Sequence, residues 1–377
     1  MPTGKRVVLH VGVPKSGTSF LQAGLREHRN LLRERGVLNA ADQTASAYHA
    51  ALEIRGQEAQ WGHRPGAFDG TWSRLCERAR AFEGTTVISH ELLAPATPAQ
   101  VARARAELHG IELHVVVTAR DLARQLPAAW QQGIKHGGRV GFADFLERTL
   151  DPDRSHPKAQ SFWARQDLGD VLSRWGDALP PEQVHVVVNP GPGADARVLW
   201  DRFLSVLGVH ADQIPMPGDG FNSSLGTTQV ELLRRVNNVV RPADQDGFYN
   251  RMVNGYLVRR LREHDSPRAS TPPERLPVVR AICEDWVTRI EKAGYHVVGA
   301  LDELLPRDLN EPTVDPDAVP TDEALDAAAA TITELLHEVD RLRERLRSRP
   351  VVTRPAPAPP PPLPKRLAAR ARRTLGH

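Results

Sequence analysis

The side chains with the clearest capacity for chemistry lie in the segment GVPKSGTS, residues 12–19. Its glycines permit close approach of a ligand to the backbone, and a helix that begins after Gly17 would aim N–H groups at an anion. Lys15 adds a mobile positive charge. The hydroxyl donors are Ser16, Thr18 and Ser19. A turn without a ligand needs the glycines but neither the lysine nor the hydroxyls, so the segment predicts an anion-binding loop.

The residue order of this loop differs from that of the ATP-binding loop, G-x-x-x-x-G-K-[ST], whose hydroxyl binds Mg²⁺. Here Lys15 precedes Gly17, and Thr18 stands where the ATP loop has its lysine. An ATP site also uses an Asp at the end of a strand. Asp121 follows a strand, but it equally suits the start of the next helix. A kinase or NTPase of the same fold type is therefore the second hypothesis.

Residues 14–19 resemble the 5′-phosphosulfate loop of the sulfotransferases that use 3′-phosphoadenylyl sulfate (PAPS), which reads approximately P-K-[ST]-G-[ST]-[ST]. The matching residues are Pro14, Lys15, Ser16, Gly17, Thr18 and Ser19. The resemblance covers roughly residues 5–306, and the closing segment GYHVVGALDELLP (294–306) is similar to an actinobacterial-type branch of the family. It implies a P-loop NTPase-like sulfotransferase fold, PAPS as donor co-substrate and no metal ion.

The second signature of the family is present in part. Its members hold the 3′-phosphate of the donor with an Arg at the end of a central strand and a Ser about eight residues further on. Here Arg120 follows the apolar run VVVTA, and Ala128 stands at the serine position. The resemblance therefore implies a donor contact for Arg120 and leaves the serine to be replaced. The candidate replacements are Arg124 and, in the segment FNSSLG (221–226), Asn222 and Ser224.

The resemblance also implies how the reaction is catalysed. A sulfuryl group carries charge spread over its oxygens, as a phosphoryl group does, so positioning and electrostatics supply most of the catalysis. Lys15 would neutralise the bridging oxygen and the departing 5′-phosphate. Related sulfotransferases commonly use Glu or His as base, which favours Glu91 and, second, His90. Strand alternation places them on opposite faces. A salt-bridged Glu91 and a half-buried His90 without catalytic roles are the alternatives.

Alternating apolar and amphipathic segments must position these residues. The predicted strands are 6–12, 85–93, 111–120 and 183–191, and the predicted helices are 18–36, 97–110, 194–208 and one that follows residue 120. This alternation predicts an α/β fold with a central parallel sheet flanked by helices. Ligands of such sheets bind at the carboxyl ends of the strands, where the loop, Arg120 and Glu91 would meet.

The sulfotransferase-like domain is expected to span residues 1–310, with two insertions. The segments 40–80 and 137–170 interrupt the alternation and contain several aromatic residues. We expect them to form walls of the acceptor site, although core-covering structure is the alternative. Flat apolar walls suit a carbohydrate, a lipid or a small metabolite that presents a hydroxyl or amine.

The C-terminal part has a different pattern. Apolar residues at alternating spacings of three and four predict a heptad helix over residues 320–349. The seam is Leu325, Ala328, Ile332, Leu335, Val339, Leu342 and Leu346. It suits a coiled coil between two copies of the chain, or an amphipathic helix docked on its own domain. A proline-rich linker and basic tail, 350–377, are predicted to be disordered.

Composition restricts the remaining function classes. The 377 residues carry 49 basic and 46 acidic side chains, a balance that argues against nucleic acid as a partner. The two cysteines form no framework, and neither a signal peptide nor a run of about 20 apolar residues is evident. We expect a cytoplasmic sulfotransferase without stable membrane insertion. A non-catalytic, sulfotransferase-like scaffold that pairs through its coiled coil is the third hypothesis.

Overall fold

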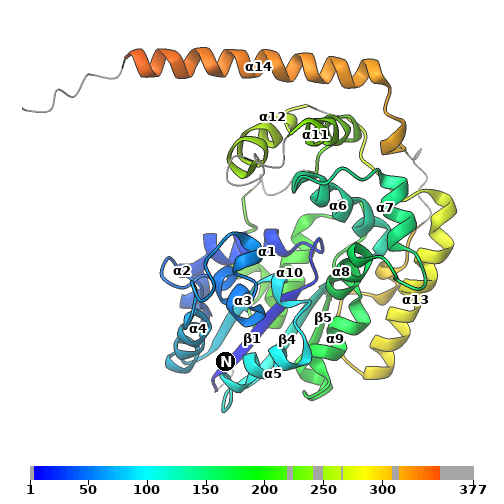
Figure 1. The fold of residues 1–377 in the computed structure, drawn as a ribbon. Coiled ribbons are helices and arrows are strands. Elements are labelled where there is room, and N and C mark those ends of the chain that lie inside the picture. Colours follow the sequence, from blue (N-terminus) through cyan, green and yellow to red (C-terminus); the bar gives the residue numbers. More distant parts are fainter. Residues whose placement is uncertain (1–3, 219–223, 241–248, 265, 308–313, 349–377) are drawn as a thin grey trace, which may run out of the picture. The chain divides into compact units, whose positions relative to one another are not determined.

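A central sheet organises the structure, a computed structural model that describes residues 4–218, 224–240, 249–264, 266–307 and 314–348. Its strands are β1 (Arg6–Gly12), β2 (Val37–Asn39), β3 (Thr85–Ser89), β4 (Glu112–Ala119), β5 (Val184–Val188) and β6 (His296–Val298). Within the described residues their order is β2-β3-β1-β4-β5-β6, and every neighbouring pair is parallel. The predicted α/β class with a central parallel sheet flanked by helices is confirmed (Figure 1).

Helices connect the strands and cover both faces of the sheet. The helices between the strands are α1 (Thr18–Glu27), α2 (Arg29–Glu34), α3 (Ala47–Arg55), α4 (Thr71–Ala81), α5 (Pro98–Ala106), α6 (Leu122–Lys135), α7 (Phe142–Thr149), α8 (Pro157–Gln166), α9 (Leu168–Gly176), α10 (Ala196–Leu207), α11 (Thr227–Val239), α12 (Val258–Leu261) and α13 (Leu276–Ala293). A further helix, α14 (Thr321–Arg347), follows the last strand. Alternation along β1 divides the core into two layers. Val7 belongs to the layer that contains Trp130 of α6, whereas Val8 belongs to the layer that contains Trp200 of α10.

Several predicted elements have different bounds in the structure. The strands β2 and β6 have three residues each, too few to show a periodic pattern. The predicted helix 18–36 is divided at His28 into α1 and α2. The predicted strand 85–93 ends at Ser89 and is followed by a short 3₁₀ helix, η2 (Glu91–Leu93). The last difference corrects the argument about the base, because strand alternation does not decide where Glu91 points.

The chain divides into two compact units, residues 1–329 and 330–377. The predicted heptad helix is present as α14, which begins in the first unit and continues in the second. The exposed apolar residues of its seam are Leu325, Ile332, Val339, Leu342 and Leu346. Pairing of two copies through this seam stays a prediction, and the tail at 350–377 lies outside the described residues. No helix in the described ranges is long and apolar enough to cross a bilayer.

Three histidines form a hydrogen-bonded row near the amino ends of β4, β5 and β6. His114 Nδ1 lies 2.8 Å from His185 Nε2, and His185 Nδ1 lies 2.8 Å from His296 Nδ1. Glu112 Oε1 lies 2.8 Å from His114 Nε2 and ends the row. Burial lowers the pKa of His185 to about 3, and the positive charges of His114, His296 and Arg6 act in the same direction. Neutral imidazoles with one proton each satisfy this row, so a further proton would disrupt it.

We expect acid to destabilise the fold through His185. In the unfolded chain this imidazole binds a proton below about pH 6.5, whereas in the folded protein its pKa is about 3. Above pH 6.5 the free energy of unfolding is therefore not affected by the protonation of His185. Below that value it falls by about 1.4 kcal/mol per pH unit, because only the unfolded chain binds the proton.

Urea unfolding near pH 7 and near pH 5 measures this effect. Between these conditions His185→Gln should lose less stability than the wild type, by about 2 kcal/mol. His210→Gln, at an exposed position, is the matched control and should behave as the wild type does. Equal losses in all three proteins would contradict the assignment.

Candidate functional site

The predicted anion loop joins β1 to α1 and depends on two glycines. Gly17 is the N-cap of α1 and has a left-handed φ of 100°. A Cβ added there would lie 2.4 Å from Leu199 Cδ2, so this position admits only glycine without displacing α10. Gly12 has a φ of 126°, and a Cβ there would lie 3.2 Å from Ala94 Cβ and 3.5 Å from Glu91 Cα. The loop therefore packs closely against both α10 and the segment that carries Glu91.

Two hydroxyl groups hold the loop from beneath. Ser16 is fully buried, and its hydroxyl donates to the carbonyl of Val13 at 2.5 Å. Its Oγ also lies 2.5 Å from Thr118 Oγ1 of β4, and Thr118 Oγ1 lies 3.1 Å from the carbonyl of Gly12, so the single proton of Thr118 is donated either to Ser16 Oγ or to Gly12 O. The Ser16 hydroxyl was expected to face the ligand. It points inward instead, because the loop uses it to close its own turn.

A buried histidine completes this network. His10 Nδ1 lies 2.8 Å from Ser89 Oγ, and its Nε2 lies 3.1 Å from Thr118 Oγ1. Burial lowers the pKa of His10 to about 4, against the opposing effect of the Glu91 charge. A neutral imidazole, with one N–H and one acceptor nitrogen, satisfies both hydroxyl contacts. His10 therefore connects the ends of β1, β3 and β4 below the loop.

Side chains from three other elements hold three successive carbonyls of the loop. Gln166 at the end of α8 donates to Pro14 O at 3.0 Å, and Arg120 Nη1 after β4 donates to Lys15 O at 3.2 Å. Asn189 after β5 donates to Ser16 O at 3.1 Å. These contacts fix the backbone of residues 14–16. Gln166 and Asn189 were not predicted as site residues, although Asn189 lies near the carboxyl end of the predicted strand 183–191.

A cavity of about 1120 Å³ opens above the loop at the carboxyl ends of the strands. Most of the predicted site residues line it: Pro14, Lys15, Gly17, Thr18, Ser19, Glu91, Arg120, Arg124 and Ser224. Ser16 and His90 do not, and Asn222 lies outside the described residues. None of the residues that line the cavity belongs to the insertions at 40–80 and 137–170, so the role of these insertions as acceptor walls stays a prediction.

Lys15 projects into this cavity and is held by a neutral partner. Its backbone has a left-handed φ of 69°, and its Nζ donates to Gln132 Oε1 of α6 at 2.7 Å. Burial lowers the pKa of Lys15; the Glu91 charge opposes this, whereas the charges of Arg120 and Arg262 add to it. An anion beside Lys15 would relieve both burial and repulsion.

Arg120 and Arg124 leave guanidinium donors without partners. Burial lowers the pKa of Arg120 to about 10, and the nearby charge of Arg124 contributes to the shift. Arg124 is fixed by its Nε, which bonds to the carboxylate of Asp121, and by its Nη1, which donates to Pro190 O at 3.0 Å. Arg120 Nε and Arg124 Nη2 are buried and have no hydrogen-bond partner. Both arginines line the cavity, and two neighbouring positive charges beside it are suited to a bound anion.

Glu91 and His90 differ in their access to the cavity. Glu91 lines it and accepts a hydrogen bond from Gln22 Nε2 of α1 at 2.8 Å. His90 Nδ1 lies 3.9 Å from Glu91 Oε2 and accepts from the backbone N–H of Leu92 at 3.2 Å. Burial favours a neutral Glu91, but the His90 charge and hydrogen bonds outweigh it and lower the Glu91 pKa. Burial lowers the pKa of His90, so the pair is a carboxylate beside a neutral imidazole.

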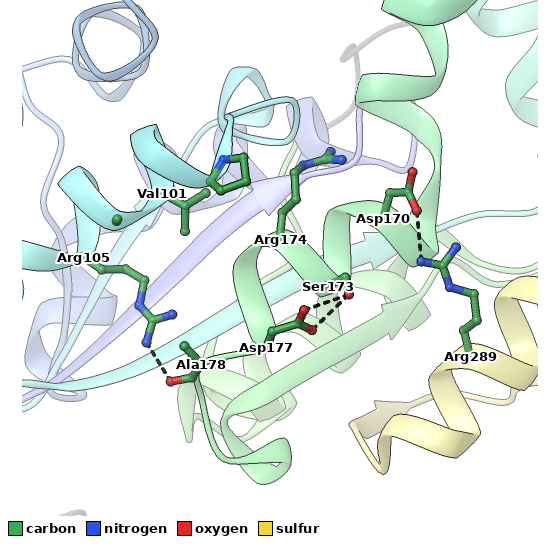
Figure 2. Close-up of a pocket in the computed structure, with 10 residues that line it drawn as sticks. Val101, Arg105, Asp170, Ser173, Arg174, Asp177, Ala178 and Arg289 are labelled. Atoms are coloured by element: carbon green, nitrogen blue, oxygen red, sulfur yellow. Dashed lines mark hydrogen bonds and ion pairs between the residues drawn. The ribbon is translucent and has the colours of Figure 1, made fainter. Parts of the chain in front are cut away.

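A second hollow, of about 810 Å³, lies between α5, α9 and α13. Figure 2 shows that Arg105, Asp170, Asp177 and Arg289 are already engaged, and Arg174 donates to Ala94 O at 3.0 Å. Arg105 Nη2 donates to Ala178 O at 2.8 Å, and Arg289 Nη2 donates to Asp170 Oδ1 at 2.9 Å. Asp177 accepts from Ser173 Oγ at 3.0 Å. This hollow therefore offers less to an anion than the cavity above the loop.

Metal-ligating side chains do not gather in the described part of the chain. No group of three or more His, Cys, Asp or Glu residues there is placed to hold a metal ion. The charged and amide side chains that line the cavity in these ranges are cations, amides and three carboxylates, those of Glu91, Asp121 and Glu303.

The sequence matches no protein-family model and no curated protein sequence. Among solved structures, the fold is similar to a sulfotransferase from Alicyclobacillus acidocaldarius, with 15% sequence identity and a TM-score of 0.39. The similarity covers 66% of this chain and 95% of that one. A likeness this distant carries no argument about function, which therefore has to be argued from the residues of the cavity.

The network beneath the loop generates a stability prediction. Thr118→Val keeps the shape of the side chain but removes the hydroxyl that contacts Gly12 O, Ser16 Oγ and His10 Nε2, and of these groups Ser16 still has Val13 O as a partner. We expect it to lower the free energy of unfolding by about 1–3 kcal/mol, measured by urea unfolding.

A neighbouring threonine provides the matched control. Thr86 of β3 is equally buried, but its hydroxyl has no hydrogen-bond partner. Thr86→Val should therefore be neutral or stabilising, because it removes an unsatisfied polar group. Equal destabilisation by both substitutions would show that the network beneath the loop contributes nothing specific.

Proposed function

We propose that this protein transfers a sulfuryl group from PAPS to a hydroxyl or amine of an acceptor. The observation that carries the proposal is the loop at residues 14–19, which presents Lys15 to a cavity lined by Arg120 and Arg124. The loop is suited to the 5′-phosphosulfate, because α1 begins at Thr18 and directs its free N–H groups towards an anion there.

The two arginines are suited to the 3′-phosphate of the donor. Ala128 lines the same cavity but offers no donor, whereas Arg124 lines it with a charged guanidinium group that Asp121 holds in place. We assign Arg124 to the role of the missing serine, beside Arg120. Ser224 at the cavity edge, and Asn222 outside the described residues, are further candidates.

Glu91 is our choice for the base. In the transfer, a lone pair of the acceptor oxygen or nitrogen forms a bond to sulfur, and the bond between sulfur and the 5′-phosphate oxygen breaks. The acceptor proton passes to Glu91, and adenosine 3′,5′-bisphosphate leaves. Gln22 orients the Glu91 carboxylate, and Lys15 stabilises the charge that develops on the departing phosphate. His90 is the second candidate, although it does not line the cavity.

The first test is binding of adenosine 3′,5′-bisphosphate, measured by calorimetry without added metal. We expect micromolar affinity, and Arg124→Met should weaken it about tenfold to a hundredfold because a charged hydrogen-bond donor is lost. Lys292→Met, at an exposed position on α13, is the control and should leave the affinity unchanged. Preference for ATP with Mg²⁺ over the bisphosphate would instead favour a kinase or NTPase.

The second test concerns the base. Glu91→Gln keeps the shape of the side chain and its contact with Gln22, but removes the proton acceptor. The assay measures the rate at which adenosine 3′,5′-bisphosphate is formed from PAPS, and water can act as the acceptor in it. We expect this rate to fall by about 10² to 10⁴-fold. His90→Gln should lower it much less. If Glu91→Gln keeps full turnover and His90→Gln does not, the role of base belongs to His90. Bisphosphate binding without turnover in the wild type would favour a non-catalytic scaffold.

A further inference from the structure

A second group of basic side chains lines the cavity at the C-terminal half of α6. Lys135 and His136 line it together with Arg262, which follows α12. Lys135 is the last residue of α6, and Arg124 is in its first turn. They are eleven positions apart in the helix, which is roughly 16 Å along the axis at 1.5 Å per residue. This end of the cavity is therefore distinct from the two arginines assigned to the 3′-phosphate.

The charges at this end are not balanced by carboxylates. Lys135 Nζ donates to Gln131 Oε1 at 3.1 Å, and Lys15 Nζ donates to Gln132 Oε1, so both ammonium groups bond to neutral amides. Among the described residues, neither of these lysines nor Arg262 forms an ion pair within 4.0 Å. Burial lowers the pKa of Lys135 to about 8, and the charges of Arg262 and Lys15 act in the same direction.

The carboxylates that line the cavity are engaged elsewhere. Asp121 bonds to Arg124, and Glu303 bonds to Arg202 at 2.7 and 3.1 Å. Glu91 affects the pKa of Lys15 but is not among the groups that shift the pKa of Lys135. Two or three neighbouring cations without a counter-charge are costly in a partly buried site unless a ligand supplies the negative charge.

The end of α6 is held rigidly in a way that suits anion binding. Asn237 Nδ2 donates to Ile134 O at 2.8 Å, and Tyr249 OH donates to the same carbonyl at 3.2 Å. Gln131 exchanges two hydrogen bonds with the backbone of Leu225, at 2.8 and 3.1 Å. The first two bonds cover a C-terminal carbonyl that would otherwise repel an anion, and together the contacts fix the turn that carries Lys135.

We infer that the acceptor itself carries a phosphate or sulfate ester, which Lys135 and Arg262 bind while its nucleophile faces Glu91; this inference rests on the proposed sulfuryl transfer. The ester would supply the missing counter-charge, and Lys15 would lie between it and the sulfuryl group. The anion would position the acceptor and take no part in the bonds that form and break, so Lys135 is a positioning residue.

The test is a calorimetric titration of inorganic phosphate onto the protein saturated with adenosine 3′,5′-bisphosphate. We expect the wild type to bind phosphate, and Lys135→Met and Arg262→Met to weaken that binding about tenfold or more. Both variants should keep the bisphosphate affinity of the wild type, and Lys292→Met should change neither ligand. Raising the pH through about 8 should weaken phosphate binding in the wild type but not in Lys135→Met, because Lys135 loses its charge there.

Three results would overturn the inference. The first is no phosphate binding by the saturated wild type. The second is phosphate binding that is lost in Lys15→Met and kept in Lys135→Met, which would place the anion in the vacant sulfuryl position. The third is a loss of bisphosphate affinity in Lys135→Met, which would assign this lysine to the donor.

Failure of the proposed function gives a different result. If the wild type does not bind the bisphosphate, phosphate is titrated onto the unliganded protein with the same variants. If phosphate binding is weaker in Lys135→Met and Arg262→Met but unchanged in the other variants, the anion site is supported and the proposed sulfuryl transfer is rejected. Phosphate binding that is insensitive to both substitutions would reject the site as well.

Discussion

The contact between the Ser16 and Thr118 hydroxyls is the interaction on which the site depends. It joins the turn of the loop to β4 directly beneath it, and His10 extends the network to β3. Because β1, β3 and β4 are neighbours in the sheet, this network aligns the ends of three strands. Lys15 above the turn, Arg120 after β4 and Glu91 after β3 are brought to one cavity as a result.

The electrostatics of the cavity follow from this convergence. Each strand end contributes a charged side chain, and the helices contribute neutral amides, of which Gln22 meets Glu91 and Gln132 meets Lys15. Amides can orient charged groups without neutralising them. The lowered pKa values of Lys15, Arg120 and Lys135 all have burial as their first cause, which means that folding conceals positive charge here. A site of this kind is stabilised when an anion binds.

The sequence predicted the parallel sheet, and most of the site residues that it predicted line the cavity, because strand–loop–helix order and the loop motif are local patterns. It could not place Ser16, whose hydroxyl points inward to Thr118, a residue 102 positions away. It also misassigned Glu91 to a strand, because the apolar residues Leu92 and Leu93 of the short helix η2 follow the apolar part of the strand after only three polar residues. Gln132 and Gln166 carry no motif, and only the folded chain brings them to Lys15 and Pro14.

The three carbonyls held by Gln166, Arg120 and Asn189 have a consequence for binding entropy. A glycine-containing loop normally loses backbone freedom when it closes around a ligand, and this loss reduces affinity. Here the ordering takes place during folding, since α8, β4 and β5 each fix one peptide group before any ligand arrives. An incoming anion therefore meets N–H groups whose directions are already set, and little of its interaction free energy is lost in immobilising them.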